Sequence, residues 1–303
     1  QDAGGDAYNV AVGYFAGTNL STAKKNVLLG GHAGQFVTLG ANSVFVGFEA
    51  GKGIDGVKLT GGDNVGVGYR AGYLLQGTAT RNTIVGYTAA DALTTGDQNT
   101  VMGYDALGAG VASFYNTAFG TGALRADTTG RNSVAVGISA LYSQNTTGSA
   151  DMHNTAVGSG AGFSVSTGFR STYIGALTGY NATTADYSTF IGFQAGQGID
   201  GTKLTGNSNT AVGASAGLLL QGVATQNTFV GASAGDAITT AISNTAVGFE
   251  SLRAAAGNSN TALGIQTGLL LTGSENVLIG NVAGTTLTDA DQNVAIGSGA
   301  LLS

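Results

Sequence analysis

The chain repeats one short pattern of apolar and polar positions along its length. Each copy ends in a glycine, and 17 such glycines lie between Gly13 and Gly297, spaced 16 to 21 residues apart with 17 as the commonest spacing. The residue before each glycine is always apolar, and the residue three before it is always Val or Thr. Positions two apart share one face of a strand, and β-branched residues favour strands. Each copy therefore predicts one short β-strand.

This strand has no polar face, because the residue two before the glycine is also apolar or Gly in every copy. A strand with one face in water alternates apolar and polar residues, so this pattern predicts burial on both faces. We expect one face to line a coil and the other to contact another copy of the chain. The large residues of the middle column are the predicted oligomer interface on the outer face of the strands: Phe45, Ile84, Val101, Tyr173, Phe190, Phe229 and Leu278.

A polar column precedes each strand. The residue four before the glycine is Asn in 13 copies and Ser in the other four. Short polar side chains suit a corner, where they bond nearby backbone, and stacked Asn residues can hydrogen-bond to one another as a ladder. The predicted corner ladder comprises Asn9, Asn26, Asn64, Asn82, Asn99, Asn116, Asn154, Asn209, Asn227, Asn244, Asn260, Asn276 and Asn293.

The repeat length determines the predicted fold. Seventeen residues are too few for the helix pairs of common helical repeats, but fit one turn of a β-solenoid, here called a rung, with two short strands. The complete absence of Pro agrees with continuous strand pairing. Residues 48–56 recur at 193–201, an offset of 145 residues or eight rungs. We predict an all-β fold, a parallel β-roll of 17 rungs that forms a single continuous array over residues 1–303 with an internal duplication.

Composition and charge exclude several classes of protein. The chain has no Cys, which removes disulfide scaffolds and thiolate metal sites. Its net charge of −6, with only 11 Lys and Arg residues, argues against nucleic acid as a partner. No apolar run reaches the length of a bilayer span, so we expect no membrane insertion. The positive mean hydropathy of +0.19 suggests apolar surface that is buried between chains.

No arrangement of residues predicts catalysis, so we expect no enzyme activity and no bound cofactor. The two histidines, His32 and His153, lie about seven rungs apart and cannot form one site. Clustered oxygen ligands near Asp97 and near Asp289 and Asp291 leave Ca²⁺ open as a cofactor. Their spacing matches no calcium-binding motif, and we favour polar residues at a rung corner.

Short motifs resemble two families of surface fibres. The hexamers at residues 42–47 and 132–137 resemble the head repeat of trimeric autotransporter adhesins, and the Asn-Thr-Ala-Val-Gly copies at 154–158 and 209–213 resemble repeats of phage tail fibres. The resemblance implies a left-handed parallel β-roll that assembles as a homotrimer. It also implies an extracellular location, on a cell surface or a virion tail.

Three rungs are longer, at 21 residues, through insertions after Gly51, Leu141 and Gly196. Insertions in solenoids form loops, often on a binding face. Charged residues, otherwise rare, gather in two of these insertions and are candidate binding residues: Lys52, Asp55, Lys58, Asp200 and Lys203. An aromatic residue follows the repeat glycine in seven rungs, at Tyr14, Phe48, Tyr69, Tyr87, Tyr104, Phe193 and Phe249. These rings could contact a sugar or a surface, but we favour packing against a neighbouring chain.

These observations favour a non-enzymatic extracellular fibre or adhesin segment that associates with itself, forms a rigid rod and displays a binding surface to a cell-surface or polysaccharide receptor. The first alternative is a subunit of a head-to-tail filament, since Gly297 and Gly13 of a following copy would be 19 residues apart, within the observed spacing. We identify no capping segment at either end of the repeat array, and excision from a longer chain is the other explanation for this. The second alternative is a solenoid that binds polysaccharide or ice, which needs a flat, exposed Thr array. We expect the Thr column to be covered, which argues against it.

Overall fold

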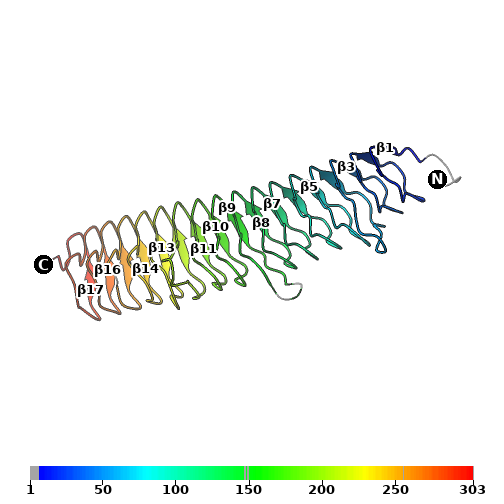
Figure 1. Cartoon of the computed structure of the whole chain (residues 1–303). Helices are drawn as coiled ribbons and strands as arrows, with labels where there is room; N and C mark the ends of the chain where they lie inside the picture. Colours follow the sequence, from blue (N-terminus) through cyan, green and yellow to red (C-terminus); the bar gives the residue numbers. More distant parts are fainter. Residues whose placement is uncertain (1–6, 147, 149, 255, 303) are drawn as a thin grey trace. The chain divides into compact units, whose positions relative to one another are not determined.

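The computed structural model describes residues 7–146, 148, 150–254 and 256–302. It is all-β: 17 parallel strands of three residues each stack as a β-solenoid of about 17 turns, and the described residues contain no helix (Figure 1). This confirms the predicted fold class. The strands are β1 (Val10–Val12), β2 (Val27–Leu29), β3 (Val44–Val46), β4 (Val65–Val67), β5 (Thr83–Val85), β6 (Thr100–Met102), β7 (Thr117–Phe119), β8 (Val134–Val136), β9 (Thr155–Val157), β10 (Thr172–Ile174), β11 (Thr189–Ile191), β12 (Thr210–Val212), β13 (Thr228–Val230), β14 (Thr245–Val247), β15 (Thr261–Leu263), β16 (Val277–Ile279) and β17 (Val294–Ile296).

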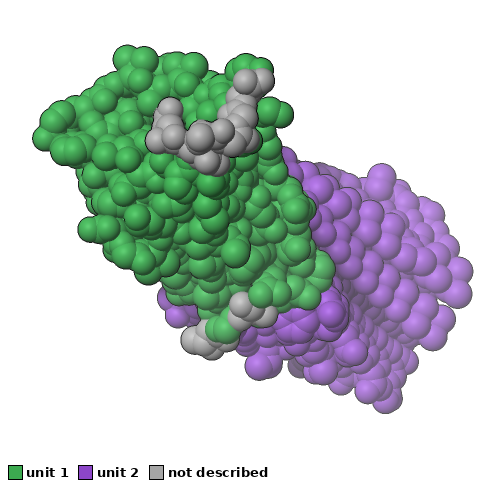
Figure 2. All heavy atoms as spheres, turned by 90° about the vertical axis from the view of Figure 1, so that its right-hand side faces the viewer, with its two compact units in different colours: residues 1–153 green, residues 154–303 purple. Residues whose placement is uncertain are grey.

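The chain forms two compact units, residues 1–153 with β1–β8 and residues 154–303 with β9–β17, which we call unit 1 and unit 2 (Figure 2). Within each unit, every strand pairs in parallel with the next one in the chain, and equivalent residues lie opposite each other. Leu28 of β2 faces Phe45 of β3 in unit 1, and Tyr173 of β10 faces Phe190 of β11 in unit 2. The repeat pattern thus becomes columns of equivalent side chains.

The middle residue of every strand from β2 to β17 is buried in the interior of the coil, whereas all three residues of β1 are exposed. Phe45, Tyr173, Phe190 and Phe229 are among the largest side chains that are fully buried within the single chain. The prediction that the middle column forms the outer face is therefore wrong for all seven residues proposed as an oligomer interface. Each of them has no exposed surface in the single chain: Phe45, Ile84, Val101, Tyr173, Phe190, Phe229 and Leu278.

The error arose because both faces of the strand are apolar, so alternation could not distinguish inside from outside. Variation in side-chain volume was the signal that could have done so. Phe45 lies opposite Gly66 on β4, and Phe190 lies opposite Ala211 on β12. A closed interior has a limited volume, so a large residue such as Phe45, Tyr173 or Phe190 has a Gly or Ala on at least one of its two neighbouring rungs, even where the other neighbour is also large. Such compensation between rungs indicates an interior column.

The predicted Asn ladder is present in both units. In unit 1, the side-chain oxygen of Asn82 accepts hydrogen bonds from the backbone N–H of Asn99 at 3.1 Å and from its side-chain amide at 2.9 Å. The Asn99 amide also donates to the carbonyl of Ser113 at 2.8 Å, which ties the start of a rung to its end. Nearly all ladder residues are buried, and a buried polar group is stable only when it is bonded in this way.

The repeat glycine is required by close packing of backbone between rungs. Gly192 has a φ of +130°, and a Cβ there would lie 2.5 Å from the carbonyl oxygen of Gly213 in the next rung. The same arrangement recurs within each unit, from Gly13 to Gly120 in unit 1 and from Gly158 to Gly280 in unit 2. Only glycine combines this conformation with so close an approach, which explains why the sequence repeat is anchored on it.

Each rung has one strand, not the two that we predicted. Elsewhere in the rungs, isolated parallel bridges replace the second strand, as between Asp97 and Phe114 and between Phe114 and Arg131. The segment after each strand turns sharply through left-handed residues, such as Glu49 and Gly51 with φ values of +58° and +54°. An extended segment cannot continue through this conformation, so no regular strand forms there.

Candidate functional site: the outward strand face and the inserted loops

The outer face of the stacked strands is apolar and partly exposed. It consists of the residues one and three before each repeat glycine, two columns that contain no charged residue. In unit 1, Met102 and Phe119 are 39% and 49% exposed, and in unit 2, Ile174 and Val230 are 39% and 37% exposed. Both faces of the strand are therefore uncharged, as the sequence indicated. The face that we assigned to the outside lies in the interior, and the face that we assigned to the interior lies outside.

Threonine dominates one of these outward columns. In unit 2, seven consecutive strands, β9 to β15, begin with Thr, and these residues lie opposite one another in register from Thr155 to Thr261. In unit 1, the series is shorter, at β5 to β7, and Thr83 and Thr100 are exposed. The expectation that the Thr column is covered by the chain's own coil is wrong, because the middle residue takes the interior position.

The exposed aromatic residues form a continuous stack in unit 1. The rings of Phe48, Tyr69, Tyr87 and Tyr104 follow one another on consecutive rungs, with centroid distances of 5.9, 4.8 and 5.6 Å and interplanar angles of 17° or less. All four are exposed, as are Tyr14, Phe193 and Phe249. Because the rings cover each other's faces, the stack presents mainly ring edges to its surroundings.

The inserted loops after Gly51 and Gly196 have matching backbones. Each has an antiparallel bridge at its tip, Ile54 to Val57 in unit 1 and Ile199 to Thr202 in unit 2. Four of the five predicted binding residues lie exposed in these loops: Asp55, Lys58, Asp200 and Lys203. The fifth, Lys52, is instead folded against the surface of unit 1, where its side chain is 19% exposed. The structure therefore separates the five residues into two equivalent sites, one in each unit.

In unit 1, the polar groups beside the loop pair with one another. The Lys52 ammonium lies 2.6 Å from the Glu49 carboxylate, and Arg70 lies 3.3 Å from the other oxygen of that carboxylate. Arg70 also stacks over the Tyr73 ring, 3.9 Å from its centroid, and Lys52 lies 5.4 Å from the same centroid. Burial acts to lower the pKa of Lys52, but the hydrogen bond to Glu49 and the charges of Tyr73 and Glu49 outweigh it and raise that pKa above its ordinary value.

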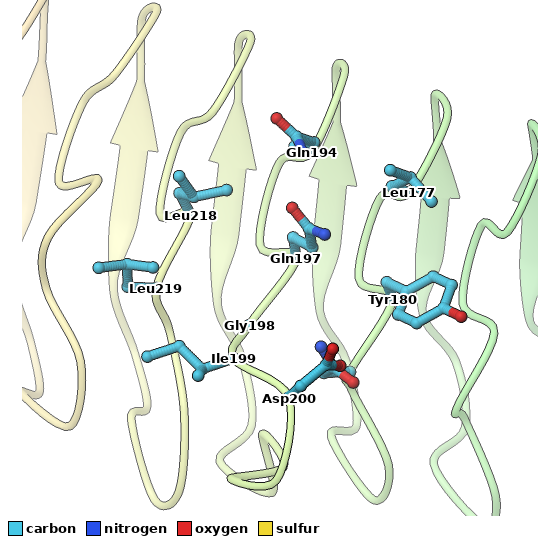
Figure 3. A pocket seen from close by; sticks show the side chains of 10 residues that line it. Leu177, Tyr180, Gln194, Gln197, Gly198, Ile199, Asp200, Leu218 and Leu219 are labelled. Atoms are coloured by element: carbon cyan, nitrogen blue, oxygen red, sulfur yellow. The ribbon is translucent and has the colours of Figure 1, made fainter.

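In unit 2, the equivalent place is an open pocket of about 400 Å³ that spans the rungs of β10, β11 and β12 (Figure 3). Gln194 and Gln197 lie on the middle rung, between Leu177 and Tyr180 on one neighbouring rung and Leu218 on the other. The pocket is lined by Leu177, Tyr180, Asn181, Gln194, Gln197, Gly198, Ile199, Asp200, Leu218 and Leu219. A pocket of this size that mixes apolar walls with a few polar groups is typical of small-molecule sites.

The histidines lie in different surroundings within unit 1. His32 belongs to an aromatic cluster with Tyr14, Phe15 and Phe48, and its Nδ1 lies 2.9 Å from the Gln35 side-chain oxygen. His153 is an exposed residue with a φ of +52° beside the Asn ladder. The two histidines therefore have different surroundings, in agreement with the expectation that they do not form one site.

The acidic segments considered for Ca²⁺ take part in contacts between rungs. Asp291 accepts a hydrogen bond of 2.6 Å from the backbone N–H of Ser274, and the Asn99 side chain belongs to the ladder. Among the described residues, no group of three or more His, Asp or Glu side chains is placed to hold a metal ion. Within the same ranges, no helix is long and apolar enough to cross a membrane.

Comparison of the sequence with protein-family models and with curated proteins gave no match.

Proposed function

We propose that the chain is a non-enzymatic, extracellular structural segment of the fibre or adhesin kind, which associates with copies of itself through the outward strand face. The observation that carries the proposal is the pair of uncharged columns on that face, with apolar side chains such as Phe119, Ile174 and Val230 left partly exposed in the single chain. Contiguous exposed apolar surface marks interaction sites. Full burial of each such side chain contributes about 1.5–3 kcal/mol.

A second copy of the chain is the occupant that best fits this face. The columns repeat once per rung, at the interstrand spacing of about 4.8 Å. A partner must present apolar groups at the same spacing over many rungs. A second copy of the same solenoid has this spacing, because its own strands repeat at the same distance. The resemblance to trimeric adhesin heads and tail fibres supports a homotrimer and a cell surface or virion tail as its location. A head-to-tail filament built from the same rungs is the alternative assembly.

Light scattering after size-exclusion chromatography tests this proposal. We expect the purified chain to elute at a multiple of its 29.7 kDa mass. The double variant Ile174→Lys and Val230→Lys places two charges on the face and should reduce the assembly to monomers. Val223→Lys is the matched control, because Val223 is 69% exposed but lies outside the strands. Wild-type protein that stays monomeric at all accessible concentrations would contradict the proposal, and long filaments in electron micrographs would favour the alternative assembly.

The Thr column of unit 2 favours a second candidate function, the binding of ice or a crystalline polysaccharide. Seven Thr side chains, from Thr155 to Thr261, lie in register on consecutive strands of one outward face, next to a column of apolar residues. Such an array offers hydroxyl and methyl groups at regular spacing to a flat, ordered surface. Growth of ice crystals in the presence of the chain tests this candidate. Arrested growth by wild-type protein, abolished in Thr210→Lys, would support it, and unaffected growth would exclude ice.

A further inference from the structure

We propose that the pocket of unit 2 beside the loop after Gly196 binds an uncharged saccharide. The inference deepens the proposed display of a binding surface, but it uses none of the residues of the strand face. It rests on the cavity of about 400 Å³, on polar side chains within it that have no partner in the chain, and on a fixed aromatic wall.

Unpaired amides are the first part of the argument. Among the described residues, the side chains of Gln194 and Gln197 have no hydrogen-bond partner, although both line the cavity and are only half-buried. Asn181 is 98% buried, since 2% of it is exposed, and its side-chain oxygen accepts a hydrogen bond of 3.0 Å from Lys203. An amide offers both donors and acceptors, as saccharide hydroxyls do. Half-exposed amides without partners in the chain bond water when the pocket is free and are available to bond ligand hydroxyls in its place.

The walls of the pocket are the second part. The Tyr180 ring is stacked on Phe163, with a centroid distance of 4.7 Å and an interplanar angle of 5°, so it is fixed in place from one side. Leu177 and Leu218 supply aliphatic surface on the two flanking rungs (Figure 3). A pyranose has a face of C–H groups and a rim of hydroxyls. Apolar walls with convergent amides match both of these features.

The backbone around the pocket holds these groups in position. The N–H of Asn181 donates to the carbonyl of Gln197 at 2.8 Å, and the N–H of Gly198 donates to the carbonyl of Leu218 at 2.9 Å. These bonds join the three rungs that carry the lining residues. A site built on hydrogen-bonded rungs loses little entropy when a ligand binds.

The lining residues disfavour anionic ligands and purely apolar ligands. The Asp200 carboxylate lines the cavity and repels phosphates and other anions. The nearest ammonium, that of Lys203, is already bonded to Asn181 and lies 3.3 Å from the Ser164 hydroxyl. A purely apolar ligand would leave the amides of Gln194 and Gln197 without partners. An uncharged ligand rich in hydroxyls is the class that satisfies all these groups.

Binding of short oligosaccharides to the full chain tests the proposal. The probes are neutral oligosaccharides of glucose, mannose and galactose, with sialylated and sulfated oligosaccharides for comparison, followed by calorimetric titration of the tightest binder. We expect wild-type protein to bind at least one neutral probe. Asp200 also offers its carboxylate oxygens to ligand hydroxyls, so Asp200→Ala should weaken this binding about tenfold, the effect of losing one hydrogen bond to a charged group. Asp55→Ala, at the equivalent position of unit 1, is the matched control and should bind as wild type does.

The double variant Gln194→Glu and Gln197→Lys introduces the residue pair that unit 1 carries at Glu49 and Lys52. We expect it to abolish binding by pairing these side chains with each other, while thermal unfolding and oligomeric mass stay unchanged. The proposal is overturned if no neutral probe binds at millimolar concentration, if only acidic probes bind, or if Asp55→Ala and Asp200→Ala weaken binding equally. Each of these results leaves self-association, which light scattering measures separately, unaffected.

Discussion

The loops after Gly51 and Gly196 are two versions of one structure, 145 residues apart. Their backbones agree closely: Gly53 and Gly198 have φ values of +76° and +77°, and equivalent bridges connect each loop to the neighbouring rungs. Their side chains differ in kind. Unit 1 carries a cluster of paired charges around Glu49, and unit 2 carries unpaired amides around an open pocket. The same backbone thus supports two chemistries.

This difference shows which side chains of a solenoid can be substituted without loss of the fold. The repeat glycines fix the rungs and recur in both copies, and the interior column is uncharged in both, with Phe45 and Phe190 identical but Leu28 and Tyr173 different in size. Residues that point outward from a loop contribute little to stability, so they can diverge. The binding functions proposed above use outward side chains, and the interior determines how these side chains are spaced.

The largest expected effect comes from the interior residues that the two copies share. Phe45→Ala and Phe190→Ala should each lower the free energy of unfolding by about 3–5 kcal/mol, because both rings are fully buried. Urea unfolding followed by circular dichroism measures this loss. Phe193→Ala is the control, since this ring is 55% exposed and its loss should cost far less. Equal, small losses in all three variants would contradict the interior placement of the middle column.

An intermediate effect should appear when the charged pair of unit 1 is replaced by the residues of unit 2. The double variant Glu49→Gln and Lys52→Gln removes an ion pair whose side chains are 15% and 19% exposed, and should cost about 1 kcal/mol locally. Hydrogen exchange of the Gly53 amide, which donates to the carbonyl of Tyr73, should become faster. The Gly198 amide of unit 2 is the internal reference. Unchanged protection of Gly53 would show that the pair contributes nothing to the loop.

The smallest effect is a pH dependence confined to unit 1. The pKa of Lys52 is raised above 10.5 in the folded chain, so its contribution to stability is complete below pH 10.5. It is lost as pH rises further, through the raised pKa of the folded state. A nuclear magnetic resonance titration of labelled lysines should show this delayed loss of the proton. In Glu49→Gln, the pKa of Lys52 should fall, because burial remains and the carboxylate is gone; an unchanged titration would contradict this cause.

The fold could be predicted from the sequence to a large extent because its determinants are local and periodic. The 17 glycines mark the 17 strands, and the Asn column forms the predicted ladder, as between Asn82 and Asn99. The 145-residue offset recurs as equivalent bridges at Leu59 and Leu204. Residues in each rung meet the same residues of the next, so a single repeat specifies its own neighbours.

The candidate sites could be predicted only in part. The insertions correctly indicated exposed loops at Asp55 and Asp200. The pocket beside Asp200 was missed, because most of its residues come from outside the insertion and carry amides or apolar groups rather than charges. Lys52 was expected among the free binding residues, but it pairs with Glu49 three residues earlier. Opposite charges three residues apart are the sequence signal for this ion pair.

The sequence by itself determined the architecture: a β-solenoid with a strand before each repeat glycine, an Asn ladder and strands without a charged face, although the second strand that we predicted in each rung is replaced by isolated bridges. Only the tertiary structure decided which face is inside. Neither face carries a charge, but the outward face has Thr in ten of the 17 strands and the middle column has almost only apolar residues and Gly, so both hydrophobicity and volume favour the observed orientation. The interior of a rung accepts one column of side chains whose sizes compensate between neighbours, as Phe45 and Gly66 do. The column of Thr and Val that begins the strands and the column of Val, Ile, Leu, Met and Phe that ends them face outward, where spacing rather than volume matters.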